Sequence, residues 1–178
     1  MREWIPVSTS PKGRLALAAV KEFGARPFDE VTVAGLAAAA KVTTGALYHH
    51  FGSKLGLYAF VREDVERRLL DRMEGALAAR ESDRASAVTS ALLVGLDFAV
   101  REDFLRILGD PPAGTGHDPL AEMLSQSAVP TAPLLGRVLA AAWRAALSAI
   151  AEGAEPEQAR AAIAALRLHL PNDGRDGK

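Results

Sequence analysis

The sequence contains no cysteine, which excludes a disulfide framework, a cysteine-ligated zinc site and a cysteine nucleophile. Aromatic residues make up only 6% of the chain, whereas alanine, the best helix former, occupies 35 positions. No apolar run approaches the roughly 20 residues needed to span a bilayer. Met1 to Thr9 also lack the basic and apolar segments of a signal peptide. We therefore expect an all-α, soluble and cytoplasmic protein.

The chain also lacks the residue patterns that most enzymes and metal sites need. No Ser, His and Asp set stands at a recognisable spacing, and no glycine-rich loop suits a phosphate. Of the four histidines, His49 and His50 are adjacent and should point apart on a helix, while His117 and His169 are isolated. The sequence therefore predicts no catalysis, no metal site and no cofactor.

Charge is distributed unevenly along the chain. Residues 1–62 contain eight Lys or Arg against four Asp or Glu, whereas residues 63–178 contain 13 against 18. A basic segment attached to an acidic body is typical of a polyanion-binding module, although an excess of this size also arises by chance.

Capping residues and apolar spacing predict about nine helices and no strand. Ser10, Thr32, Thr43 and Ser53 each precede a helical pattern as N-cap residues. Gly24 is expected to end the first helix. Later helices are expected after Ser82 or Asp83, from Leu120 to Ala128, from Thr131 to Glu152 and from Pro156 to Leu170, with a loop from Gly109 to Pro119.

The stretch from Thr32 to Lys54 carries the clearest functional signal. Two short helices, each with its own N-cap, are separated by a turn of about three residues, which is a helix-turn-helix arrangement. The second helix of such a pair enters the major groove of DNA, where its N-terminal residues meet base edges. The predicted base-reading and phosphate-binding residues are Thr32, Lys41, Thr43, Thr44, Gly45, Tyr48, His49 and Lys54. For Tyr48 the alternative to DNA contact is packing in the core, and for Phe51 core packing is the favoured interpretation. For Lys54 the alternative to a phosphate contact is an ordinary solvated lysine.

These residues resemble the tetracycline-repressor (TetR) family of transcriptional regulators. The resemblance covers roughly residues 12–61, through RLALAAVKEFGARPFDEVTV, GLAAAAKV and TTGALYHHFGSKLGLYAFV. Its most specific part is an aromatic-His-Phe group followed by Ser-Lys and a leucine, present here as Tyr48-His49-His50-Phe51 and Ser53-Lys54-Leu55.

Two residues depart from the family pattern. Lys41 stands in the turn where the family most often has glycine, so it is expected to adopt a left-handed conformation at a cost of about 1 kcal/mol. Gly56 stands where the family commonly has a polar residue, and it is expected to weaken the first turn of the long helix that begins after Ser53. Because that helix would connect the effector-binding domain to the DNA-reading helices, Gly56 is expected to be a flexible point in the connection.

The resemblance implies a second helical domain for effector binding and dimerisation. We expect a helix-turn-helix domain at 10–53, an effector and dimerisation domain at 54–171 and a frayed tail at 172–178. The expected dimer interface is an apolar stripe on the last two helices, formed by Leu135, Leu139, Ala142, Ala146, Ile150, Ile163 and Leu166. The alternative is that this stripe closes the core of a single subunit. Candidate effector-pocket residues are Phe98, Arg101, Phe104, Met123 and Trp143, each with plain core or surface as the alternative.

Two functions remain open from the sequence. One is a homodimeric repressor that binds a pseudo-palindromic DNA operator and is released by a small-molecule effector. The other is a helical ligand-binding or protein-interaction module that retains the helix-turn-helix only as a scaffold. Steep weakening of binding with salt distinguishes the DNA reader.

Overall fold

The computed structural model describes residues 9–79, 83–112, 117–128 and 133–166, and within these ranges it contains nine α-helices and no strand. The predicted all-α class is thus confirmed. A short 3-10 helix, η1 (Phe28–Glu30), lies between the first two α-helices. The α-helices are α1 (Pro11–Ala25), α2 (Val33–Ala39), α3 (Thr44–Phe51), α4 (Lys54–Ala78), α5 (Arg84–Arg101), α6 (Leu105–Gly109), α7 (Pro119–Ala128), α8 (Pro133–Ala151) and α9 (Pro156–Ala165).

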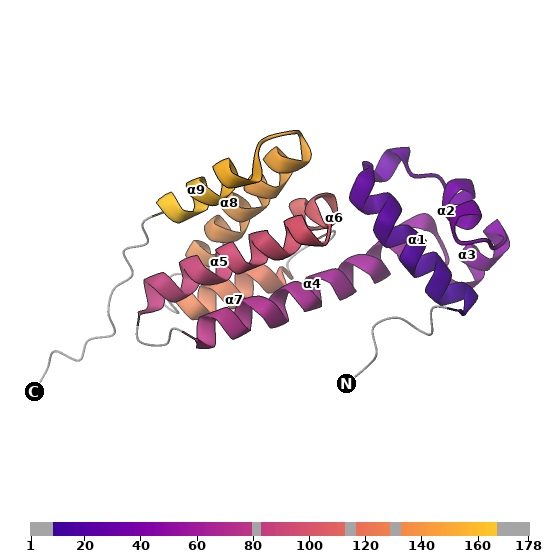
Figure 1. Ribbon diagram of the computed structural model, residues 1–178. Coiled ribbons are helices and arrows are strands. Elements are labelled where there is room, and N and C mark those ends of the chain that lie inside the picture. Colours follow the sequence, from indigo (N-terminus) through magenta and orange to yellow (C-terminus); the bar gives the residue numbers. More distant parts are fainter. Residues whose placement is uncertain (1–8, 80–82, 113–116, 129–132, 167–178) are drawn as a thin grey trace, which may run out of the picture.

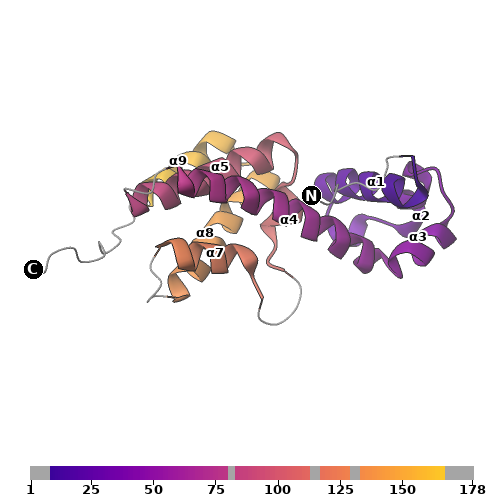
Figure 2. The same ribbon diagram turned by 90° about the horizontal axis from the view of Figure 1, so that it is seen from below.

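The helices form two groups joined by one long helix. α1, α2 and α3 form a head at one end of the molecule, and α5 to α9 form a body at the other (Figure 1). α4 begins within the head and continues along the body beside α5 and α7, as the view from below also shows (Figure 2). Any shift of α4 relative to the body therefore moves the head.

The predicted N-caps are in place because each side-chain oxygen accepts a hydrogen bond from a free amide of the first helical turn. Ser10 Oγ accepts from the amide of Gly13 at 3.0 Å, and Ser53 Oγ accepts from the amide of Gly56 at 2.9 Å. Asp83, one of the two expected caps, begins α5. At the other end of the chain, α9 ends at Ala165; the expected residues up to Leu170 and the tail at 172–178 lie outside the described ranges.

Gly24 does not end α1, which continues to Ala25. Its role is a close contact between head and body: a Cβ atom at this position would lie 2.6 Å from the carbonyl oxygen of Asp103, in the turn between α5 and α6. Asp103 itself has a positive φ of 60°. The sequence pattern does not reveal this contact because the two residues are far apart in the chain.

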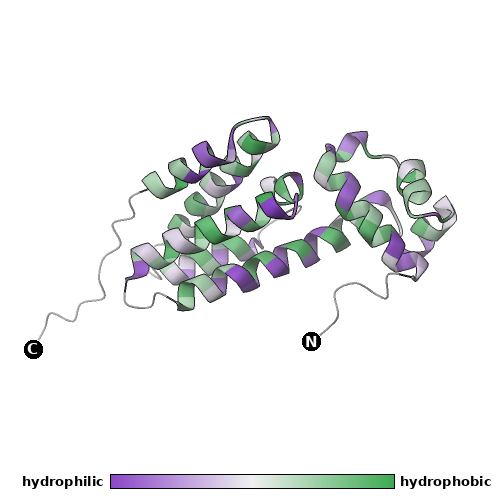
Figure 3. Cartoon of the chain, in the orientation of Figure 1, coloured by the Kyte–Doolittle hydropathy of each residue, from purple (hydrophilic) through white to green (hydrophobic). Residues whose placement is uncertain are grey.

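One apolar core extends from the head through the body. Leu15, Leu36 and Leu47 are fully buried in the head, and the indole of Trp143 in the body donates a hydrogen bond to the carbonyl of Leu92 at 3.0 Å. Along α4, hydrophilic and hydrophobic segments alternate, so that one side packs inward and the other faces water (Figure 3).

α8 is more apolar and less covered than the sequence suggested. In the part of the chain that the structure describes, Leu134–Ala151 is a stretch of 18 residues with mean hydropathy 1.4, which by length and composition alone is able to cross a membrane. This corrects the expectation that no run approaches that length. Only 33% of the stretch is fully buried within the subunit, and Leu134, Val138, Ala141 and Ala145 are exposed.

Candidate nucleic-acid interface

The turn between α2 and α3 has the geometry of a left-handed helix cap. The amide of Lys41 donates to the carbonyl of Ala38 at 3.0 Å, and the amide of Val42 donates to that of Ala37 at 3.0 Å. This pair of hydrogen bonds is a Schellman motif, which places a left-handed residue directly after the helix. Lys41 has a φ of 54°, so the predicted left-handed lysine is confirmed. The conformation turns the chain sharply and leaves the Lys41 side chain exposed.

α1 holds this turn from behind. The guanidinium of Arg14 donates through Nε to the carbonyl of Ala40 at 3.0 Å and through Nη1 to the carbonyl of Thr9 at 2.5 Å. Because Ala40 is the C-cap residue of α2, directly before the turn, Arg14 fixes where the turn begins and hence where α3 starts. This role of Arg14 is not evident from the sequence, since its acceptor is a backbone carbonyl 26 residues away.

α3 has one buried and one exposed face. Leu47 is fully buried against the head, whereas Tyr48 keeps 54% of its surface exposed. Thr44, Gly45 and His49 are exposed with Tyr48, so these four predicted residues share the outward side of α3. A small residue pair at the start of the helix, with an aromatic side chain one turn later, leaves the helix end accessible to a groove.

Phe51, at the end of α3, packs inward, in agreement with the interpretation that it is a core residue. Its ring lies 5.3 Å from the ring of Phe60 on α4, and the ammonium of Lys12 lies 5.0 Å from the Phe60 ring centre and 5.9 Å from that of Phe51. These contacts anchor the C-terminal end of α3 to α1 and α4.

The hydroxyl groups of Thr32 and Thr43 already act as helix caps. Thr32 Oγ1 accepts from the amide of Gly35 at 3.0 Å, and Thr43 Oγ1 accepts from the amide of Ala46 at 3.2 Å. Each hydroxyl retains its own proton for donation to a further acceptor such as a phosphate oxygen. Both residues are exposed, and their contacts with DNA remain predictions.

Lys54 is bound within the head. Its ammonium donates to the carbonyls of Phe28 and Val31 at 2.9 Å each and lies 4.1 Å from the centre of the Phe28 ring. These contacts tie the start of α4 to η1. They explain why a lysine stands at a helix N-terminus, where its charge opposes the helix dipole, without requiring a contact to DNA. The phosphate contact of Lys54 stays a prediction, and the structure gives this residue a role in the fold.

Gly56 is a point of close contact between α3 and α4. A Cβ atom here would lie 2.1 Å from the carbonyl oxygen of Phe51, the last residue of α3. The absence of a side chain therefore allows α4 to start directly against the end of α3. The expected weakening of the first turn of α4 stays a prediction, and the structure adds this contact to it.

His49 and His50 do not point apart as expected. Their rings meet edge to face, with centres 4.9 Å apart. Among the described residues, no group of three or more His, Cys, Asp or Glu side chains lies together in a way that would hold a metal ion.

The structure places the predicted effector-pocket residues in different surroundings, and their role in binding an effector stays a prediction. Phe98, Phe104 and Trp143 are at most 3% exposed and belong to the core, where the rings of Phe98 and Phe104 lie 5.5 Å apart. Met123 is half-buried. Arg101 is exposed and lines a hollow of about 170 Å³ between α5 and α9, whose walls include none of the three core aromatics.

A larger hollow of about 300 Å³ lies where the head meets the body. Its walls come from the end of α1, from η1, from α4, from α6 and from the end of α8, and they include Phe28, Tyr58 and Arg106. This hollow is not evident from the sequence because it is formed by segments that are distant in the chain.

The predicted dimer stripe mostly faces the subunit's own core. Leu139 and Ile163 are only 3% and 2% exposed, which corrects the expectation that these two lie at an interface. Leu135, Ala142, Ala146 and Ile150 are half-buried, and Leu166 is 37% exposed. The large exposed apolar residues of α8 are instead Leu134 and Val138, at 67% and 62%.

Comparison with known proteins identifies the head. Residues 16–60 match the family described as "Bacterial regulatory proteins, tetR family". Among curated proteins, none matches the chain.

Solved structures of similar fold cover nearly the whole chain. A TetR-family transcriptional regulator from Pectobacterium atrosepticum is 24% identical, with a TM-score of 0.58 over 89% of this chain and 94% of that one. PfmR, a TetR-family regulator from Thermus thermophilus, is 21% identical, with a TM-score of 0.60 over 94% and 100%. The TetR-family repressor AlkX from Dietzia sp. strain DQ12-45-1b, implicated in biodegradation of n-alkanes, is 17% identical, with a TM-score of 0.54 over 91% and 96%. Residues 16–60 therefore match the tetR family over the helix-turn-helix region, and the chain as a whole has the TetR-like all-α fold of these solved structures.

Proposed function

We propose that the protein is a transcriptional repressor that binds a pseudo-palindromic operator as a homodimer and is released by a small-molecule effector. The observation that carries the proposal is the outward face of α3, where Thr44, Gly45, Tyr48 and His49 are all exposed on a TetR-family domain. In this role the head, residues 10–53, reads DNA in the cytoplasm, and the remainder up to residue 171 responds to the effector. The continuous helix α4 carries the response to the head.

Binding to DNA upstream of the protein's own gene tests this function. With excess non-specific competitor, we expect saturable binding of two subunits per site in fluorescence anisotropy. Thr44→Ala and Tyr48→Ala should each weaken binding about tenfold or more, because each removes a contact worth about 1–3 kcal/mol at a base edge or phosphate. Gln126→Ala, an exposed change on α7 in the body, is the matched control and should bind like the wild type.

Salt dependence separates specific DNA reading from the scaffold alternative. The affinity should fall steeply between about 50 and 200 mM salt, and Lys41→Ala should reduce the slope by about one released counterion. If neither this DNA nor DNA selected from random sequence binds better than competitor, the proposal fails and the helix-turn-helix is a scaffold. Once an operator is known, release from it in the same assay identifies effectors.

The homodimer in this proposal uses the outward stripe of α8 rather than the predicted one. Leu134, Val138, Ala141 and Ala145 are all exposed and recur at helical spacing, so they form one continuous apolar stripe. Exposed apolar stripes of this kind mark protein interfaces in chains that stay in water. The small alanines allow two α8 helices to approach closely, which favours a second copy of the same helix as the partner.

Charge introduced on this stripe should break the dimer. Leu134→Glu combined with Val138→Glu should convert the protein from dimer to monomer, because two carboxylates would be buried without partners. Sedimentation velocity measures the mass of the particle directly. Leu55→Glu replaces a leucine of the head that is 56% exposed, and it should leave the dimer intact. A double variant that still sediments as a dimer places the interface elsewhere.

A further inference from the structure

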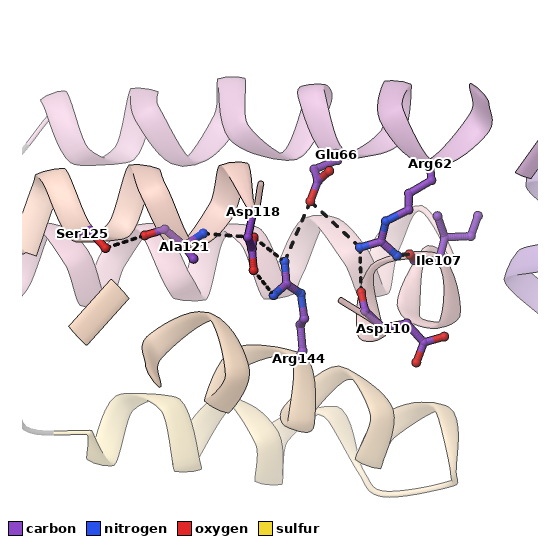
Figure 4. A network of polar contacts seen from close by, with 8 residues as sticks. All are labelled: Arg62, Glu66, Ile107, Asp110, Asp118, Ala121, Ser125 and Arg144. Carbon is purple, nitrogen blue, oxygen red and sulfur yellow. Dashed lines mark hydrogen bonds and ion pairs between the residues drawn. The ribbon is translucent and has the colours of Figure 1, made fainter. Parts of the chain in front are cut away.

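Four charged side chains, two of them from α4, lie together inside the body. Arg62 and Glu66 lie one turn apart on α4, Asp118 directly precedes α7, and Arg144 lies on α8 (Figure 4). Arg62, Glu66 and Arg144 are between 6% and 8% exposed. We call these four residues the buried charge cluster.

Arg62 binds the segment around α6. Its guanidinium donates through Nη1 to the carbonyl of Ile107 and through Nη2 to the carbonyl of Asp110, at 2.6 Å each. Both carbonyls stand at or just after the C-terminal end of α6, where helix carbonyls otherwise lack partners. One arginine of α4 therefore closes the end of α6.

Arg144 and Asp118 join α8 to the start of α7. The guanidinium of Arg144 donates to both carboxylate oxygens of Asp118, at 2.6 and 2.8 Å, and the same carboxylate accepts from the amide of Ala121 at 3.2 Å. Burial acts to raise the pKa of Asp118, but the hydrogen bonds from Arg144 and Ala121 outweigh it and hold the pKa below its usual value. Asp118 is therefore ionised and firmly held.

Glu66 lies loosely between the two arginines. Its carboxylate is 4.0 Å from Arg62 and 3.9 Å from Arg144, too far for a hydrogen bond to either. Burial raises its pKa, against the lowering effect of both arginines. The Nε atoms of Arg62 and Arg144 are buried without a partner among the described residues. The cluster is thus incompletely satisfied, so its net stabilisation is small.

The alternation of charge along α4 nevertheless favours a single register. A shift of α4 by one turn, about 5 Å, would place Arg62 at the present position of Glu66, against the positive charge of Arg144. The opposite shift would place the carboxylate of Glu66 against the carbonyl oxygens of Ile107 and Asp110. One displaced register brings two positive charges together in a buried site, and the other brings a carboxylate against two carbonyl oxygens. An apolar contact between the same helices would not distinguish the present register from the displaced ones.

We propose that the buried charge cluster is a latch that fixes the register of α4 against α7 and α8 and thereby sets the position of the head. Its regulatory meaning rests on the proposed function, because α4 would carry the effector response to the DNA-reading helix. A latch that is incompletely satisfied opens with a modest input of binding energy, which suits an element that has to switch.

The test measures the distance between head and body without using DNA. Because the chain has no cysteine, Lys21→Cys on α1 and Gln126→Cys on α7, both exposed, provide two unique spin-label sites. Labelled subunits diluted into unlabelled protein report the distance within one subunit by double electron–electron resonance. The test variants are Glu66→Gln, which removes one charge at constant shape, and Glu66→Met with Arg144→Met, which removes one charge of each sign.

We expect the unaltered cluster to give one narrow distance distribution. Both test variants should broaden it or shift it by about 5 Å, the rise of one helical turn. Asp71→Asn, an exposed charge removal on the same helix, should leave the distribution narrow. Unchanged distributions in folded test variants overturn the latch, and the double variant decides if Glu66→Gln fails to fold. Distances that shift in a protein that binds no DNA would support the latch and refute the proposed function.

Discussion

Gly136→Ala is expected to lower the free energy of unfolding by about 3 kcal/mol, a large effect for one added methyl group. A Cβ atom at this position on α8 would lie 2.1 Å from Ser125 Oγ, 2.2 Å from the carbonyl oxygen of Ala121 and 2.4 Å from the amide nitrogen of Ser125. The last two are backbone atoms of α7 and cannot rotate away. The two helices would have to separate, and their shared core would loosen.

Urea denaturation followed by circular dichroism measures this change. Gly75→Ala is the matched control, because this glycine lies in the exposed part of α4 and an added Cβ would meet nothing within 4 Å. There the substitution should stabilise the protein by up to about 1 kcal/mol through helix propensity. A Gly136→Ala protein as stable as the wild type would show that α7 and α8 do not cross this closely.

Asp64→Asn is expected to stabilise the protein relative to the wild type increasingly as the pH rises. The side chain of Asp64 is 5% exposed; its Oδ1 atom binds Arg67, while Oδ2 is buried without a partner among the described residues. Burial, opposed by Arg67 and Arg68, raises the pKa of Asp64 from 3.8 to about 6. An asparagine has the same shape and carries no charge that would resist burial.

The sign of the pH dependence follows from proton uptake. Between about pH 4 and 6 the folded wild type binds this proton more tightly than the unfolded chain, so the contribution of Asp64 to stability is greatest below about pH 4 and falls up to pH 6. The advantage of Asp64→Asn should therefore grow by about 2 kcal/mol between about pH 4 and pH 7.5. Urea denaturation at both pH values measures the difference. Asp71→Asn, an exposed carboxylate of the same helix that does not act on Asp64, should follow the wild type. An advantage independent of pH would contradict the burial of an ionised Asp64.

The head was largely predictable because its determinants are local. The caps at Ser10, Thr32, Thr43 and Ser53 each bind an amide three residues later, so a short stretch of sequence is enough to reveal them. The left-handed Lys41 follows from the turn that two such helices require. Which faces of the body are buried was less predictable, since on α8 two neighbouring apolar stripes look alike in the sequence and only packing distinguishes them.

The sequence by itself determined the helical class, the starts of the first four α-helices and the helix-turn-helix, because capping and helical periodicity act between residues within a few positions of each other. Only the tertiary structure decided that Gly56 and Gly136 are contact points, that Lys54 binds η1 and that Arg62, Glu66, Asp118 and Arg144 meet in the core. These features join segments distant in the chain. Their partners are chosen by which helix faces come together on folding, and no local pattern encodes that choice.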